Sequence, residues 1–158
     1  MKNFAVAVDG SPASLAALKW AMAAGDPTSA IWACNIQDPI NFHQDTHAAI
    51  VAGSIDMDLT PNPAEEITHT GPLGHSIEEL GRTYGRTVTW VPLTVTPGQS
   101  SCAEAFYQAA LGRRADVLVA GRHQGSALME GMFGSFPRWL VTHAHLPTVI
   151  VPPGPDAR

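Results

Sequence analysis

Residues suited to binding an anion gather between Gly121 and Ser135. This stretch follows an apolar run, residues 117–120, which predicts a buried strand, and a glycine directly after a strand lets a ligand approach the backbone closely. At its far end, Ser135 is a natural N-cap, and Pro137 is tolerated in the first turn of a helix. The free N–H groups of a helix start bind phosphate, so we predict a phosphate site between two loops. The stretch lacks a Walker lysine and is not a standard P-loop.

The elements that must position these residues alternate between strand and helix patterns. Apolar strands that alternate with helices predict a parallel sheet covered on both faces, and right-handed crossovers make it doubly wound and Rossmann-like. We therefore expect an α/β fold with a five-stranded, mostly parallel sheet. The strand patterns lie at 4–8, 30–36, 88–95, 117–120 and 147–151, and the helix starts are marked by Ser11, Ser76, Ser101 and Ser135.

Two of these strands place the residues that could do chemistry. Residues 4–8 and 117–120 are continuous apolar runs, so we expect them to be adjacent interior strands. Ligands of such sheets bind beyond the carboxyl ends of the strands, where Asp9 and Gly121 follow the two runs. Asp9 has two interpretations: a carboxylate that faces a ligand, or an acceptor for turn amides before the Ser11 cap.

Length, composition and charge restrict the class of protein. A chain of 158 residues with 45% hydrophobic residues is most simply one domain, 1–158. Its net charge of −5 argues against a nucleic-acid or anionic-membrane surface, and no apolar run approaches membrane-spanning length. The first nine residues do not form a signal-peptide pattern, so we expect a cytoplasmic protein. Cys34 and Cys102 have no metal or CxxC spacing and are interpreted as reduced thiols.

Residues 41–74 fit the alternating pattern poorly and are interpreted as an atypical loop or insertion within the domain. Long loops of this kind are usually lids, binding loops or disordered segments. His43 and His47 have a spacing that could place two metal ligands on one helical face, but surface histidines are the favoured interpretation, and we expect no metal site. Residues 152–158 contain three prolines and are expected to form a flexible tail.

Three segments together resemble the universal stress protein family. The Val-Asp-Gly-Ser sequence at 8–11 and the helix pattern at 12–21 are very like the family's first strand end and first helix. ATP-binding members carry Gly-x2-Gly-x9-Gly-(Ser/Thr), which here begins at Gly121 and ends at Gly134 and Ser135. The closing segment 144–151 is similar to the family's last helix and strand. The resemblance covers most of the chain except residues 41–74.

The resemblance implies an adenine nucleotide alpha hydrolase-like fold that binds ATP or AMP, with Mg²⁺ accompanying ATP, in a stress-response or signalling role. Asp9 would accept hydrogen bonds at the adenine or ribose end, and Ala7 with Ile36 would line the nucleobase. Any catalysis would be slow ATP hydrolysis, and the sequence names no catalytic general base. The nucleotide-binding residues that the resemblance implies are Ala7, Val8, Asp9, Ile36, Ala120, Gly121, His123, Gln124, Gly134, Ser135 and Phe136.

The last strand is expected to form a homodimer. Thr148–Val151 is an apolar segment without charges, and such an edge strand is a liability unless it is paired or covered. The resemblance also implies dimers that use this strand. The prolines that follow would limit further pairing, because proline cannot donate to a strand ladder.

Two positions depart from the family motif. Gln124 stands where the second motif glycine is expected, and its side chain would crowd a phosphate, although Gly125 could compensate by a shift of register. Pro137 removes an amide and a hydroxyl donor from the helix start. We therefore expect weak nucleotide binding, and the alternative is an interaction protein of the same fold that binds no nucleotide.

Overall fold

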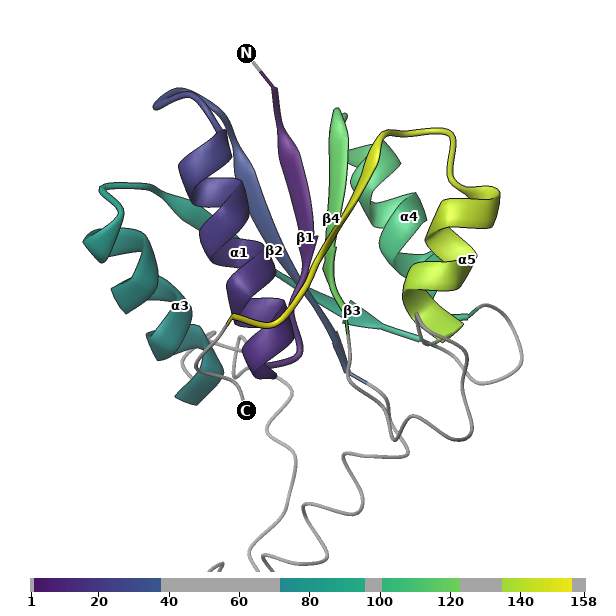
Figure 1. Ribbon diagram of the computed structural model, residues 1–158, viewed down its shortest axis with the longest axis horizontal. Helices are drawn as coiled ribbons and strands as arrows, with labels where there is room; N and C mark the ends of the chain where they lie inside the picture. Colours follow the sequence, from purple (N-terminus) through teal and green to yellow (C-terminus); the bar gives the residue numbers. More distant parts are fainter. Residues whose placement is uncertain (1, 38–71, 96–100, 123–134, 155–158) are drawn as a thin grey trace, which may run out of the picture.

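The computed structural model describes residues 2–37, 72–95, 101–122 and 135–154 of the chain (Figure 1). Strands and helices alternate along these residues, as the sequence predicts. In chain order the elements are β1 (Phe4–Ala7), α1 (Pro12–Ala24), β2 (Ile31–Gln37), α3 (Pro72–Thr83), β3 (Val88–Thr94), α4 (Cys102–Gly112), β4 (Val117–Gly121), α5 (Ser135–His143) and β5 (Thr148–Val151).

Within the described residues, five strands form one parallel sheet in the order β3-β2-β1-β4-β5. β1 lies between β2 and β4, so Val6 is opposite Ala33 on one side and Val119 on the other. The prediction that the first and fourth strands are adjacent and interior is therefore confirmed. The chain winds outward from β1 in both directions, which places a topological switch point at the carboxyl ends of β1 and β4.

Helices cover both faces of the sheet, as Figure 1 shows. Side chains alternate along a strand, so Phe4 and Val6 of β1 pack on the side of α1 and α3, whereas Ala5 packs on the side of α4 and α5. Fully buried side chains fill each layer, including Leu18 in the first and Phe106 in the second. These two layers confirm the doubly wound, Rossmann-like α/β fold.

Hydroxyl caps begin two of the helices where the sequence predicts them. Ser11 precedes α1, and its side chain accepts a hydrogen bond from the Ser14 amide at 3.2 Å, while Pro12 fills the first helical position. Ser101 precedes α4 and accepts from the Glu104 amide at 3.1 Å. Each bond satisfies an amide that has no partner within its own helix.

Helix α3 begins at Pro72, one turn before the start predicted from Ser76, so that prediction of its start is wrong. Proline suits the first position of a helix, and Leu73, Ile77 and Leu80 follow at helical spacing and pack on the core. Ser76 is therefore an exposed residue within the helix and not its cap. The last residues of the segment 41–74 belong to α3, and residues 41–71 lie outside the described part of the chain.

The boundaries near the predicted phosphate site also differ by one residue from the sequence prediction. Ser135 is the first residue of α5 and not its cap, and the position before it lies outside the described residues. Pro137 is in the first turn, as predicted, and its side chain is buried. β4 continues to Gly121, and β1 ends at Ala7, although the Val8 amide still donates to the Cys34 carbonyl at 2.8 Å.

Both cysteines are free thiols, as the sequence predicts. Burial of Cys34 raises the pKa of its thiol from an ordinary 9.0 to about 12, and the charge of Arg113 acts weakly in the opposite direction. Of the helices in the described residues, none is long and apolar enough to cross a membrane. Residues 152–154 of the predicted tail are described and adopt no regular structure, and residues 155–158 lie outside the description.

Candidate functional site

The carboxyl ends of β1 and β4 bring two of the predicted segments together. The strands pair in register from Phe4 opposite Val117 to Val6 opposite Val119, so the residues that follow each strand emerge side by side. Figure 1 shows the starts of α1 and α5 at this same lower edge of the sheet. The predicted binding residues Ala7, Val8, Asp9, Ala120 and Gly121 therefore share one edge of the sheet, as expected.

The loop between β1 and α1 fixes the Asp9 carboxylate. Asp9 is exposed, and its Oδ1 accepts a hydrogen bond from the Ser11 amide at 2.9 Å. Gly10 has a φ of +85°, a backbone conformation that L side chains rarely adopt. Asp9 thus accepts a hydrogen bond from a turn amide before α1, which is one of the two interpretations that the sequence allowed. A carboxylate oxygen has two lone pairs, so this bond is compatible with a second donor from a ligand.

Gly121 is buried where the end of β4 meets the backbone of α1. A Cβ atom at this position would overlap the carbonyl carbon of Ala13 and would lie 2.7 Å from the amide nitrogen of Ser14. Only a glycine fits at such a distance from another backbone. The structure therefore gives Gly121 a packing role against α1, and its contact with a phosphate stays a prediction.

The start of α5 offers amides to an anion. Ser135 is exposed at the first position, and the first N–H groups of a helix have no partner within it. Phe136 packs on the buried Phe106 of α4 with ring centroids 5.6 Å apart, and Trp139 packs on Tyr107 at 6.2 Å. These aromatic pairs anchor α5 to α4, so its amino end is held at the carboxyl edge of the sheet.

His123, Gln124 and Gly134 lie outside the described residues, as does the side chain of Ile36. The same holds for His43 and His47. In the part of the chain that is described, no group of three or more His, Cys, Asp or Glu residues could hold a metal ion.

Sequence analysis missed Asn35, a buried amide at the carboxyl end of β2. Its Nδ2 donates a hydrogen bond to the carbonyl oxygen of Val8 at 2.9 Å. The available signal was an asparagine inside the apolar strand pattern 30–36, because a buried amide needs a partner. Asn35 therefore belongs to the framework that surrounds the candidate site.

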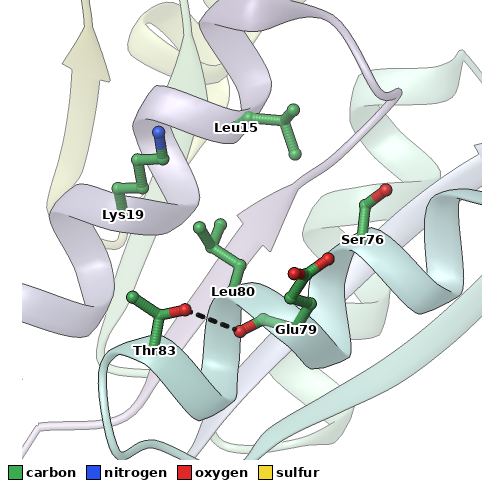
Figure 2. Close-up of a pocket in the computed structure, with 6 residues that line it drawn as sticks. All are labelled: Leu15, Lys19, Ser76, Glu79, Leu80 and Thr83. Carbon is green, nitrogen blue, oxygen red and sulfur yellow. Dashed lines mark hydrogen bonds between the residues drawn. The ribbon is translucent and has the colours of Figure 1, made fainter.

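A separate groove of about 330 Å³ lies between α1 and α3, on one helical face of the molecule (Figure 2). Figure 2 shows Leu15 and Leu80 from the two helices on facing walls, and a hydrogen bond of 3.0 Å from the Thr83 hydroxyl to the Glu79 carbonyl. The groove contains none of the predicted binding residues. Its lining residues are Leu15, Lys19, Ser76, Glu79, Leu80 and Thr83.

The parallel sheet and the switch point beside β1 define a doubly wound α/β protein of the Rossmann-like class. The model of the universal stress protein family matches residues 1–152, and the chain belongs to this family. The resemblance to this family is thereby confirmed. No curated protein sequence matches the chain.

Solved structures of universal stress proteins share this fold. A universal stress protein from Archaeoglobus fulgidus has a TM-score of 0.65 at 15% identity and covers 96% of this chain and 98% of its own. UspA from Lactobacillus plantarum has a TM-score of 0.61 at 16% identity, and the match covers 95% of this chain and 97% of the UspA chain. A universal stress protein in complex with cAMP has a TM-score of 0.61 at 19% identity, and the match covers 97% of this chain and 98% of that protein's chain.

Proposed function

We propose that this universal stress protein binds an adenine nucleotide, ATP or AMP, at the carboxyl ends of β1 and β4. The observation that carries the proposal is the common edge of the sheet at which the fixed Asp9 carboxylate and the start of α5 both lie. Parallel sheets bind their ligands at such a switch point. A structural neighbour in complex with cAMP, an adenine nucleotide, adds support from the family.

The two ends of the nucleotide have separate partners in this proposal. Asp9 accepts hydrogen bonds from the ribose or adenine, and Ala7, Val8 and Ile36 line the nucleobase. The start of α1 is less suited to phosphate, because Ser11 and Asp9 already accept hydrogen bonds from the Ser14 and Ser11 amides. The phosphates therefore lie at the start of α5. The residues assigned to that end are Ala120, Gly121, His123, Gln124, Gly134, Ser135 and Phe136.

Gln124 tunes the affinity in this proposal. A glutamine at a motif glycine brings a side chain toward the phosphates, so Gln124→Gly is expected to tighten ATP binding by about fivefold or more. Adenosine, which has no phosphate, should bind both proteins equally and serves as the internal control. Titration calorimetry measures both ligands. Equal ATP affinities in the two proteins would contradict the steric role of Gln124.

The proposed biological role is stress response or signalling by a cytoplasmic homodimer. β5 lies at the end of the strand order and pairs with β4 on one side, and all four of its residues are half-buried. A second β5 across this edge would satisfy its remaining backbone groups. The proposal includes no catalysis beyond slow ATP hydrolysis, with Mg²⁺ bound to the phosphates.

Binding is tested with purified protein and a panel of ATP, AMP, cAMP and adenosine. Asp9→Ala is expected to weaken the binding of all four ligands, because each of them contains the nucleoside. Gly134→Val is expected to weaken the binding of ATP more than that of the other ligands, since a branched side chain fills the approach to the phosphates. Thr142→Ala on α5, which removes a hydroxyl bonded within its own helix, is the matched control and should bind as wild type does.

An interaction protein of the same fold that binds no nucleotide is the second candidate function. Gln124 at the motif glycine favours it, because that side chain could close the phosphate site. The ligand panel separates the two functions. If no member binds at millimolar concentration while the protein is folded, the interaction protein becomes the better conclusion.

A further inference from the structure

Two buried polar side chains hold the loop that carries Asp9. Among the described residues, the buried polar side chains are Ser14, Ser29 and Asn35. Ser29 lies two residues before the amino end of β2, but the other two bond to the loop that follows the carboxyl end of β1. Ser14 Oγ accepts from the Asp9 amide at 3.3 Å and donates to the Ser11 carbonyl at 3.0 Å, and Asn35 Nδ2 donates to the Val8 carbonyl at 2.9 Å.

These bonds meet on one peptide group. The carbonyl of Val8 and the amide of Asp9 belong to the same peptide unit, which Asn35 holds from β2 and Ser14 holds from α1. The unit lies just past the point where β1 leaves the sheet, since the Val8 amide makes the last ladder bond to Cys34. A buried carbonyl there needs a donor, and Asn35 supplies it. The Val8–Asp9 peptide is thus fixed at both of its polar atoms.

The fixed peptide also orients a side chain. The Asp9 carboxylate is attached directly to this peptide unit, and the Ser11 amide donates to its Oδ1 at 2.9 Å. Rotation of the Val8–Asp9 peptide would move the carboxylate away from the edge of the sheet. A group that is held in its bound geometry before the ligand arrives loses less conformational entropy on binding.

We propose that Asn35 and Ser14 are positioning residues that clamp the Val8–Asp9 peptide, so that the Asp9 carboxylate is already oriented toward the nucleoside end of the ligand. This inference rests on the proposed function, adenine nucleotide binding at this edge of the sheet. The two residues act through Asp9. Their loss therefore weakens the nucleoside end of the site and leaves the phosphate end at α5 unchanged.

The test is calorimetric titration of adenosine and of ATP into wild type, Asn35→Ala, Asn35→Asp and Ser14→Ala. Asn35→Asp keeps the side-chain size and replaces the donor by an oxygen. Each variant is expected to bind both ligands about fivefold to tenfold more weakly than wild type does. The factor of loss should be the same for adenosine and for ATP. In an Asp9→Ala background, Asn35→Ala should cause no further loss, because the residue through which it acts is absent.

A control and a second readout separate positioning from general destabilisation. Ile31→Val at the amino end of β2 also disturbs the core, since Ile31 is fully buried, but it should leave affinity unchanged. Amide hydrogen exchange of the unliganded proteins should show the Asp9 N–H exchanging faster in Asn35→Ala and Ser14→Ala than in Ile31→Val.

The outcomes distinguish this inference from the proposed function. Wild-type affinity in Asn35→Ala, a loss that persists in the Asp9→Ala background, or unchanged exchange at Asp9 would overturn the positioning role while nucleotide binding stands. Failure of the wild type to bind either adenosine or ATP would overturn the proposed function, and the ligand-orienting role with it.

Discussion

At the residue scale, Gly121 connects the packing of the fold to the candidate site. Its absent side chain lets the end of β4 lie against the backbone of α1 beside Ser14, one of the residues that hold the Asp9 loop. A Cβ atom there would meet backbone, which cannot rotate away as a side chain can. The position is therefore sensitive even to the smallest substitution.

Gly121→Ala is expected to lower the free energy of unfolding by about 1–3 kcal/mol, the usual cost of overpacking. Urea unfolding followed by circular dichroism measures this change. Gly112→Ala is the matched control: a Cβ atom there meets nothing within 4 Å, so the protein should be as stable as wild type or slightly more so. Equal stability of Gly121→Ala and Gly112→Ala would contradict the close approach of β4 and α1.

The Cys34 thiol gives a pH dependence at the same scale. Burial raises its pKa to about 12, so the native state favours the neutral thiol and its contribution to stability is complete below pH 9.0, the unfolded value. That contribution is lost as the pH rises from 9.0 toward 12. Wild type should lose more stability than Cys34→Ala over this range. Parallel pH curves for the two proteins would show that the thiol is not buried in solution.

At the scale of elements, the caps of α1 and α4 were predictable and the start of α3 was not. Ser11 and Ser101 each precede an apolar helical pattern, and a hydroxyl with that spacing has few alternatives to capping. Ser76 has the same local pattern with Glu79, but Pro72 and Leu73 extend the helix by a turn because Leu73 packs on the core. Tertiary packing here outweighs a local capping signal.

Ser101→Ala tests the capping of α4. Its hydroxyl accepts from the Glu104 amide at 3.1 Å, so the substitution should reduce the free energy of unfolding by about 1 kcal/mol. Ser101→Ala leaves in place the aromatic side chains by which α4 packs on α5, so nucleotide affinity should not change. Thermal unfolding measures the first effect and calorimetry the second. Unchanged stability would mean that this helix start draws its stability from other contacts.

At the scale of the whole molecule, the strand pattern predicts the layers and the central strand pair. The apolar runs of β1 and β4 can be buried on both faces only inside a sheet, which is the arrangement observed. The Asn35 bond to Val8 was not predictable, because the two residues are distant in sequence and become neighbours only when β2 pairs with β1. The contact of Gly121 with α1 likewise depends on tertiary packing.

The proposed dimer is tested at the same scale by light scattering. Wild type should be a dimer at micromolar concentration, and Val149→Lys on β5 should shift it toward monomer, since a charge on an edge strand opposes pairing. Val141→Lys on α5 is the matched control: Val141 is 63% exposed in the monomer and lies outside the strand, so the dimer should persist. A monomeric wild type would overturn the proposed interface.

The most direct measurement is mass spectrometry of the small molecules that purified protein releases when it is denatured. The compound identified in this way is then titrated into ligand-free protein. The account predicts an adenine nucleotide, with an affinity that falls in Asp9→Ala and is unchanged in Thr142→Ala. The absence of any released adenine nucleotide, together with no binding of ATP, AMP, cAMP or adenosine at millimolar concentration, would contradict it.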